Sequence, residues 1–387
     1  MRNPLSDKVV EMKPSGIRKF FDLVQEMPNA ISLGVGEPDF DTPWHIREEG
    51  IYSLEKGRTF YTSNAGLLEL RKAIAHYMYR KYDLEYDPVH EIVVTVGGSE
   101  GIDLALRAMI NPGDEVILPE PAFVSYLPCI KLADGVPVTI NLKEENQFKL
   151  QPEELLAAIT DKTKILILSY PNNPTGATAP DAFYEELIRF AKANDIIVLH
   201  DTAYSNLVFD GEEGRSFLYY EGAKDIGIEF NSFSKTYGMA GARIGICVGN
   251  KEIVGMLRKL KSNIDYGMFL PIQKAAITAL TQDQSVVEET REQYQKRRDM
   301  LVEGFHKAGW EVASPKGTMF MWAAIPKTYA NSEQFAIALL QKTGVLVTPG
   351  SAFGTYGEGF VRIALVQSEE VIEKALQAVQ KSGFFIS

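Results

Sequence analysis

The sequence predicts an α/β fold in which a mostly parallel central sheet is covered by helices on both faces, with a smaller α+β unit beside it. Two observations lead to this prediction. Between about residues 65 and 280, short apolar runs rich in β-branched residues alternate with amphipathic stretches, which is typical of a parallel sheet with crossover helices. Beyond about residue 285 the alternation ends and a long, highly charged segment begins.

Six runs are predicted as strands because they are apolar with little alternation, as in strands that are buried on both faces. They cover residues 91–96, 115–118, 164–169, 196–200, 227–230 and 244–248. Helical patterns occupy residues 101–109, after the first of these strands, and residues 183–193, before the fourth. Loop signals rich in Asn, Pro and Gly fall at residues 111–114 and 171–176.

The charged segment 286–306 is predicted as one exposed helix that leads into the smaller unit. A chain of 387 residues suits two or three domains. We expect a large domain of residues 46–285 and a small domain formed by residues 1–45 together with residues 286–387.

Composition excludes several classes of function. Forty Lys and Arg against 51 Asp and Glu give a net charge of −11, so we expect no nucleic-acid or membrane partner. The N-terminus lacks the apolar core of a signal peptide and no apolar run reaches membrane-spanning length, so we expect a cytoplasmic protein. Two cysteines and five scattered histidines favour neither a disulfide framework nor a metal site.

Ligands of an open parallel sheet bind beyond the carboxyl ends of its strands, so the residues that follow each strand are informative. Residues 97–101, Gly-Gly-Ser-Glu-Gly, follow the first strand and open a helix. They suit either a phosphate at a helix N-terminus or a simple turn in which Ser99 is the N-cap. Gly34-Val35-Gly36 begins like a dinucleotide-binding motif, but Asp39 stands where its last glycine should fall, which excludes NAD.

Polar residues also follow three further strands. Asn173 lies in a Pro- and Gly-rich turn, and its amide would suit an oxygen on a bound ring. Asp201 ends a buried strand, where a carboxylate is costly unless it caps a helix or pairs with a cation such as a protonated ring nitrogen. The densest cluster, which suits a phosphate and a Schiff base together, comprises Ser232, Ser234, Lys235 and Arg243.

These motifs, together with Asp201-x-x-Tyr204, Gly36-Glu-Pro-Asp-Phe and Val361-Arg362-Ile363, occur in the order and approximate spacing of one enzyme family. The chain resembles the fold-type I, pyridoxal-phosphate-dependent aminotransferases of class I/II from about residue 15 to 370. The resemblance implies the PLP-dependent transferase fold, with the large domain binding the cofactor pyridoxal 5′-phosphate. It also implies a ping-pong transfer of an amino group from an L-amino acid to a 2-oxo acid, with 2-oxoglutarate as the expected acceptor.

The resemblance assigns roles residue by residue. Lys235 corresponds to the lysine that forms the Schiff base and carries the proton, and Asp201 to the carboxylate that keeps the pyridine nitrogen protonated. Tyr204 and Asn173 correspond to donors to the phenolic oxygen of the ring, and Phe123 to the aromatic residue stacked on it. The expected phosphate ligands are Ser232, Ser234 and Arg243, with the backbone N–H groups of Ser99 and Glu100.

Two further roles concern the substrate and a second chain. Arg362 corresponds to the arginine that grips the α-carboxylate of the substrate, near the N–H of Gly36 and the amide of Asn173. Tyr61 resembles the tyrosine that a homodimer partner donates to the neighbouring phosphate, so we expect a homodimer.

The donor amino acid stays open. Thr202-Ala203 after Asp201, Ser99-Glu100-Gly101 and residues 262–266 resemble the branch that contains LL-diaminopimelate aminotransferases. Residues 13–21 are similar instead to broad-range aromatic, aspartate and alanine enzymes. Selectivity for the side chain is expected from Ile17, Arg18 and the surroundings of Tyr266.

Three alternatives accompany this interpretation. A C–S β-lyase would use the same lysine and aspartate but would need no oxo-acid acceptor. A serine β-lactamase-like hydrolase is suggested by Ser232-x-x-Lys235, Tyr329-x-Asn331 and Lys342-Thr-Gly344, although the last two motifs are too close together for that family. The sensor half of a transcription regulator would need a DNA-binding domain, for which fewer than thirty residues precede the first core motif.

Overall fold

The computed structural model describes residues 4–12, 27 and 30–385. The segment 13–21 and the selectivity residues Ile17 and Arg18 therefore lie outside the described residues.

The central feature is a seven-stranded sheet with the order β2-β8-β7-β6-β5-β3-β4. All neighbouring strands run parallel except β8, which is antiparallel to β2 and to β7. This confirms the predicted, mostly parallel sheet. The strands are β2 (Ile92–Thr95), β3 (Glu115–Glu120), β4 (Val136–Asn141), β5 (Thr163–Ser169), β6 (Ile197–Asp201), β7 (Gly227–Ser232) and β8 (Gly245–Gly249).

All six predicted strands are present, and β4 is the one in this sheet that the sequence analysis missed. Among the described strands it lies at the edge of the sheet and pairs only with β3, and it is mostly exposed or half-buried. An edge strand that contains Pro137 and the polar residues Thr139 and Asn141 lacks the continuous apolar run by which buried strands are recognised.

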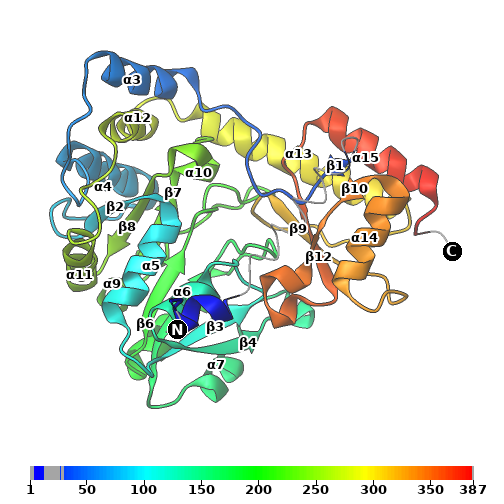
Figure 1. Ribbon diagram of the computed structural model, residues 1–387, viewed down its shortest axis with the longest axis horizontal. Coiled ribbons are helices and arrows are strands. Elements are labelled where there is room, and N and C mark those ends of the chain that lie inside the picture. The colour runs from blue at the N-terminus through cyan, green and yellow to red at the C-terminus, as the bar shows by residue number, and fades with distance from the viewer. Residues whose placement is uncertain (1–3, 13–26, 28–29, 386–387) are drawn as a thin grey trace.

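Helices cover both faces of the sheet (Figure 1). Neighbouring residues of one strand belong to opposite apolar cores, Val93 to the core on one face of the sheet and Val94 to the core on the other. The helices of this part are α3 (Trp44–Glu55), α4 (Leu68–Tyr82), α5 (Gly97–Met109), α6 (Tyr126–Leu132), α7 (Pro152–Ala158), α8 (Asp181–Ala193), α9 (Ala223–Ile226), α10 (Phe233–Thr236), α11 (Lys251–Lys261) and α12 (Leu270–Thr281). A short helix near the N-terminus, α1, spans Asp7–Glu11.

The C-terminal part contains two small sheets and three longer helices around a third apolar core (Figure 1). One sheet is antiparallel with the order β11-β12-β9, and in the other β1 pairs in parallel with β10, so a segment near residue 31 joins this part. The elements are β1 (Ile31–Ser32), β9 (Phe320–Ala324), β10 (Val345–Leu346), β11 (Thr348–Pro349), β12 (Phe360–Ala364), α13 (Ser285–Lys307), α14 (Ser332–Thr343) and α15 (Glu369–Ser382). The limits proposed for two domains stay a prediction.

The helix predicted at 286–306 is present as α13, but the expectation that it is exposed is wrong for one of its faces. Tyr294, Leu301 and Phe305 are fully buried in the third core. Two buried arginines on the same helix form ion pairs: Arg297 with Asp39, and Arg298 with Asp210. Their charges made the segment look more exposed than it is, because a buried arginine with a carboxylate partner cannot be distinguished from a solvated one in the sequence.

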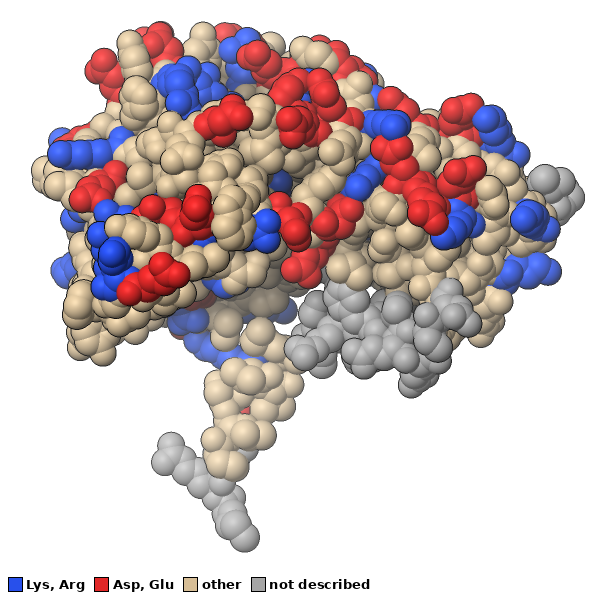
Figure 2. All heavy atoms as spheres, turned by 90° about the horizontal axis from the view of Figure 1, so that it is seen from above, with Lys and Arg blue, Asp and Glu red and all other residues tan. Residues whose placement is uncertain are grey.

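Positive and negative side chains are interspersed on the face of the molecule that Figure 2 shows. Among the described helices, none is both long and apolar enough to cross a membrane.

Candidate active site

Most predicted site residues converge on one cavity of about 370 Å³ beyond the carboxyl ends of β5, β6 and β7. Residues that follow β3 lie in its wall, and so do Arg362 of β12 and the N-terminus of α5. The predicted residues that line it are Gly36, Ser99, Phe123, Asn173, Asp201, Tyr204, Ser232, Ser234, Lys235, Arg243 and Arg362.

Lys235 lies on α10, a single helical turn that begins directly after β7. The hydroxyl of Ser232 caps this turn by accepting a hydrogen bond from the N–H of Ser234 at 3.2 Å. The Nζ of Lys235 donates to the carbonyl of Gly36 at 2.8 Å. Burial, with the nearby charge of Arg362, lowers the pKa of Lys235 to about 8. The lysine therefore loses its proton more readily than a solvent-exposed lysine does.

Asp201 is the last residue of β6 and accepts two hydrogen bonds. The hydroxyl of Tyr126 donates to Oδ2 at 2.7 Å, and the N–H of Ala203 donates to Oδ1 at 3.0 Å. Burial raises the pKa of Asp201, and both hydrogen bonds oppose that shift. No lysine or arginine among the described residues forms an ion pair with Asp201, so the carboxylate is free to pair with a cationic group of a ligand.

Arg362 is a buried cation on β12, only 3% exposed. Its Nη1 donates to Oδ1 of Asn173 at 3.1 Å and its Nη2 to the carbonyl of Gly34 at 3.0 Å, while Nε has no hydrogen-bond partner among the described residues. The guanidinium lies 4.0 Å from the ring centroid of Phe320 and 4.6 Å from that of Phe353. Burial lowers the pKa of Arg362 to about 10.

The environment of Arg362 is that of an anion site. Among the described residues no carboxylate forms an ion pair with it, and an unpaired buried charge is costly. A carboxylate that enters the cavity would supply the missing negative charge, and a guanidinium can bind both of its oxygens at once.

A second anion-binding region surrounds the N-terminus of α5. Gly97 has a positive φ of 76°, and a Cβ there would lie 2.5 Å from Nη2 of Arg243. Because glycine has no Cβ, the guanidinium of Arg243 can lie against the first turn of α5. A Cβ on Gly98 would meet no atom of the described residues within 4 Å, so the space beside this residue of the first turn is open. Arg243 itself has a left-handed φ of 52°, an uncommon conformation that occurs at functional sites. Free N–H groups, an arginine and the hydroxyls of Ser232 and Ser234 together suit a phosphate.

Aromatic groups line the space between the two anion-binding regions. Tyr204 is buried, and that burial raises its pKa, so the phenol stays a donor. Phe123 contacts Tyr126 edge-to-face with 5.5 Å between the ring centroids, and both line the cavity. A flat ring placed between the anion regions would meet aromatic surface and the carboxylate of Asp201.

Two predicted residues do not line the cavity. The carboxylate of Glu100 accepts hydrogen bonds from Lys261 at 3.1 Å and from the N–H of Val96 at 2.5 Å, so its side chain is directed away. Tyr61 is 87% exposed, beside Tyr266 at 5.5 Å between ring centroids. The role of the Glu100 N–H and the role of Tyr61 in a partner's site stay predictions.

The structure also brings in residues that the sequence analysis did not single out. Tyr126, Phe320 and Asn231 line the cavity, and Phe353 packs on Arg362. Tyr126 lies 75 residues before Asp201 in the sequence, so no local pattern could have revealed their hydrogen bond. The sequence does not distinguish an aromatic residue that packs on a buried arginine from one that fills an apolar core.

The motifs of a serine β-lactamase do not assemble. Asn331 caps the N-terminus of α14 by accepting from the N–H of Gln334, and Gly344 ends the same helix with a φ of 73°. Tyr329 packs on the ring of Phe335 at 5.3 Å. None of these three residues lines the cavity that contains Lys235. Their spacing therefore reflects the caps of one helix.

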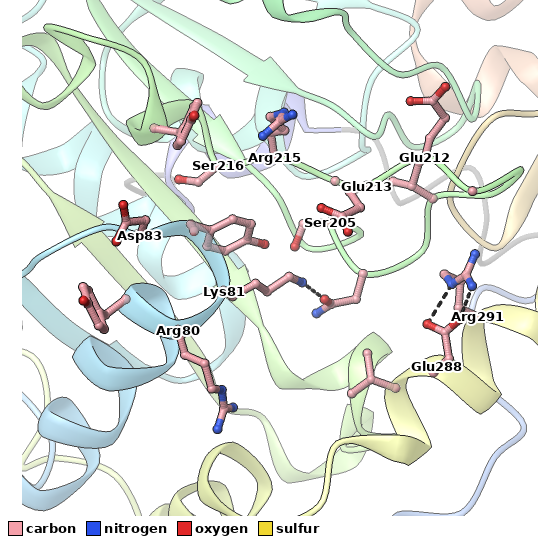
Figure 3. Close-up of a pocket in the computed structure, with 18 residues that line it drawn as sticks. Arg80, Lys81, Asp83, Ser205, Glu212, Glu213, Arg215, Ser216, Glu288 and Arg291 are labelled. Atoms are coloured by element: carbon pink, nitrogen blue, oxygen red, sulfur yellow. Dashed lines mark hydrogen bonds and ion pairs between the residues drawn. The ribbon is translucent and has the colours of Figure 1, made fainter.

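A second, larger cavity of about 770 Å³ lies between the end of α4, the loop after β6 and the start of α13 (Figure 3). Its charges are largely paired or hydrogen-bonded within the protein: Arg291 with Glu288, and Lys81 with Oδ1 of Asn206. None of the residues predicted as ligands of a cofactor or substrate lines it.

Comparison with known proteins identifies the family. The model of the family "Aminotransferase class I and II" matches residues 28–379. The LL-diaminopimelate aminotransferase of Halothermothrix orenii is 44% identical over 359 residues, 92% of each chain, and the aromatic-amino-acid aminotransferase 2 of Thermococcus litoralis is 38% identical over 97% of each. The structure of the aspartate aminotransferase of Thermus thermophilus with maleate superposes with a TM-score of 0.92 at 35% identity, covering 99% of this chain and all of the other. The chain therefore belongs to the class I and II aminotransferases, enzymes that transfer an amino group with pyridoxal 5′-phosphate as their cofactor.

Proposed function

We propose that this aminotransferase moves the amino group of an L-amino acid to 2-oxoglutarate, in the cavity built around Lys235. The observation that carries the proposal is the placement of three buried groups in that cavity: an amine of lowered pKa, a carboxylate and an arginine. Among the described residues the carboxylate has no cationic partner and the arginine no anionic one. These are the groups that an amino acid and a phosphorylated pyridine together require.

The residues present fit pyridoxal phosphate. Its phosphate would be held at the N-terminus of α5, by Arg243 and by the hydroxyls of Ser232 and Ser234. Asp201 would hold the proton on the pyridine nitrogen, and Asn173 and Tyr204 would donate to the ring oxygen. When bound, the cofactor supplies an electron sink for the carbanion that forms at the substrate Cα.

The chain's own groups would perform the remaining tasks. Arg362 binds the α-carboxylate and fixes the orientation of the substrate, with Asn173 and the backbone of Gly36 beside it. Lys235 holds and moves the proton at the substrate Cα, which its pKa of about 8 allows near neutral pH. The rings of Phe320 and Phe353 exclude water from the arginine, which strengthens its attraction for the carboxylate.

The donors proposed are aromatic amino acids, aspartate, alanine and diaminopimelate-like amino acids. The names of the relatives support this range, because they include LL-diaminopimelate, aromatic-amino-acid and aspartate aminotransferases. Tyr266, at 73% exposed, offers a large aromatic surface beside Tyr61 on which a second chain could complete a substrate pocket.

We further propose a homodimer in which Tyr61 reaches the phosphate of the neighbouring active site. Exposed aromatic and aliphatic side chains cluster in the segments around it, which is unusual for a free surface. They include Ile51, Tyr52, Leu54, Phe60, Tyr61, Tyr266 and Phe269. A cytoplasmic location is part of the same proposal and is supported by the two unpaired cysteines, Cys129 and Cys247.

An absorption experiment tests the proposal. Single L-amino acids are added to the cofactor-loaded protein without an oxo acid, and the visible band is followed. Donors should bleach the band, and 2-oxoglutarate should restore it with release of the matching oxo acid. Release of ammonia and pyruvate without any acceptor would indicate a β-lyase instead. Failure of the protein to bind the cofactor would contradict the whole assignment.

A further inference from the structure

The site proposed for the substrate α-carboxylate is built from two separate pieces of the chain. One is Arg362 on β12, and the other is the backbone of the segment 34–36, which follows β1. Nη2 of Arg362 donates to the carbonyl of Gly34 at 3.0 Å, and a Cβ on Gly36 would lie 3.3 Å from the same nitrogen. The carbonyl of Gly36 also accepts the hydrogen bond from Lys235. The geometry of the site therefore depends on how the segment and the strand are held together.

A buried arginine on a third element binds both pieces. Arg297 of α13 is 4% exposed, and its helix lies beside the segment that joins β1 to α3 (Figure 1). Nη1 and Nη2 donate to Oδ1 and Oδ2 of Asp39 at 2.7 and 2.8 Å, and Nη1 also donates to the carbonyl of Leu365 at 3.1 Å. Asp39 comes three residues after Gly36, and Leu365 comes three residues after Arg362. One guanidinium therefore connects the two pieces of the carboxylate site.

Aromatic rings fix the orientation of this guanidinium. It lies 4.7 Å from the ring centroid of Phe40 and 5.7 Å from that of Tyr294, and the two rings meet edge-to-face with 5.1 Å between their centroids. The segment is also held a little further along, because the hydroxyl of Thr42 donates to the carbonyl of Gly238 at 2.7 Å. The segment that passes the cavity is thus attached both to α13 and to the loop that follows α10.

The charge of Arg297 is matched within the protein. Both oxygens of Asp39 accept from the guanidinium in two parallel hydrogen bonds, an arrangement that fixes orientation as well as distance. Neither residue lines the active-site cavity. Arg362, in contrast, has no carboxylate partner among the described residues. The two buried arginines therefore differ in their tasks: Arg297 holds the structure, and Arg362 is left to bind an anion.

We propose that Arg297 is a positioning residue for the substrate α-carboxylate. By binding the segment after Gly36 and the end of β12 at once, it keeps the two pieces of the carboxylate site in fixed relative positions. The inference deepens the proposed function, because it rests on the role given there to Arg362 and Gly36. Arg297 touches neither substrate nor cofactor and acts through these two residues. A lysine would not replace it, since an ammonium lacks the planar fork that reaches a carboxylate and a carbonyl in fixed directions.

Two amines that differ only in the carboxylate test this role. Phenylalanine carries the group that Arg362 would bind, and phenethylamine is the same amine without it. Each is mixed with the cofactor-loaded protein, and the bleaching of the visible band gives the rate constant of the half-reaction divided by the dissociation constant. In Arg297→Lys this ratio should fall about 10- to 100-fold for phenylalanine and stay within about twofold for phenethylamine. An equal loss for both compounds would overturn the proposal, because a general loss of structure affects both.

Calorimetry with hydrocinnamate removes the reaction from the measurement. This compound has the carboxylate and the ring of phenylalanine but no amine, so its binding reports on the carboxylate site. Its dissociation constant should rise about 10-fold or more in Arg297→Lys, and an unchanged constant would contradict the positioning role. Asp39→Asn keeps the shape of the partner but weakens the ion pair, so it should show the same selective loss to a smaller extent. It decides the question if Arg297→Lys does not fold.

Arg298→Lys is the matched control. Arg298 also binds a carboxylate and a carbonyl, since Nη1 and Nη2 donate to Asp210 at 3.0 and 2.7 Å and Nη1 donates to the carbonyl of Pro315 at 3.2 Å. Neither Asp210 nor Pro315 lines the active-site cavity. Arg298→Lys should lower the midpoint of urea unfolding without changing the preference for phenylalanine over phenethylamine. If it loses that preference as much as Arg297→Lys does, the proposal is wrong.

Arg362→Lys, measured in the same way, separates this inference from the proposed function. If Arg362→Lys loses the preference for phenylalanine while Arg297→Lys keeps it, the carboxylate role of Arg362 stands and the positioning role of Arg297 falls. If neither variant loses the preference, the role proposed for Arg362 falls as well. Loss in both variants, with Arg298→Lys unaffected, is the expected result.

Discussion

Replacing Arg362 with lysine tests how the substrate carboxylate is bound. The guanidinium of Arg362 is held by two acceptors, Oδ1 of Asn173 and the carbonyl of Gly34, and by two aromatic rings, so its orientation is fixed before substrate arrives. A lysine keeps the charge but loses the planar fork, and can offer only one well-directed donor to the two carboxylate oxygens.

The expected effect follows from one lost charge-assisted hydrogen bond. Such a bond contributes about 1.5–3 kcal/mol, which corresponds to about a 10- to 150-fold rise in KM for the amino acid. Because the contact exists in both the bound substrate and the transition state, kcat should change little. Steady-state kinetics with several donors, and with 2-oxoglutarate, would measure both constants.

The matched control is Arg298→Lys, since Arg298 is an equally buried arginine, 4% exposed at its side chain, that pairs with Asp210 far from the cavity. That change should lower the free energy of unfolding and leave KM unaltered. A KM for Arg362→Lys that is unchanged with several donors, or one that rises equally in Arg298→Lys, would refute the carboxylate role.

Four further predictions concern the same site. Lys235→Met should abolish turnover. At pH 7 it should also raise the free energy of unfolding of the cofactor-free protein in urea by up to about 3 kcal/mol, because the folded protein lowers the pKa of Lys235 from 10.5 to about 8 and so pays to bury an ammonium group. This gain should shrink as the pH rises from 8 toward 10.5, where the unfolded chain also loses the proton. Tyr126→Phe removes a hydrogen bond that lowers the pKa of Asp201, so the acid limb of kcat/KM should move up by about one to two pH units; an unmoved limb would count against Asp201. Mixing inactive Lys235→Ala with impaired Tyr61→Ala should restore about a quarter of wild-type activity through hybrid dimers, and no recovery would place Tyr61 outside the partner's site. Inorganic phosphate should raise the unfolding temperature of the cofactor-free protein more than that of Arg243→Gln, and equal shifts would argue against an anion site at α5.

The sequence was sufficient for the parts of the fold that depend on local pattern. The six buried strands were predictable because short, continuous apolar runs bounded by Gly, Pro and Asn are typical of strands buried on both faces. The edge strand β4 was not, because a strand that pairs along one side can contain a proline and polar residues, here Pro137, Thr139 and Asn141. The buried face of α13 was missed for a related reason, since Arg297 and Arg298 are neutralised by Asp39 and Asp210, which are distant in the sequence.

The same distinction applies to the site. Residues at or shortly after the end of a strand, such as Asp201 and Lys235, could be predicted to lie together because the strand ends of a parallel sheet converge. Tyr126, Phe320 and Phe353 were not, because their importance lies in what they contact. A tyrosine that donates to a carboxylate and a phenylalanine that covers a guanidinium have the same sequence signature as ordinary core residues.

The charges of the cavity explain why these contacts matter together. Lys235, Arg243 and Arg362 line it against the carboxylates of Glu37 and Asp201, so the protein presents an excess of positive charge in a partly dehydrated space. A phosphate beside Arg243 and a substrate carboxylate beside Arg362 would balance that excess of positive charge. A buried charge interacts most strongly with an opposite charge where water is absent. The unpaired buried charges therefore destabilise the protein without its ligands, and the same charges bind the ligands strongly and in one orientation.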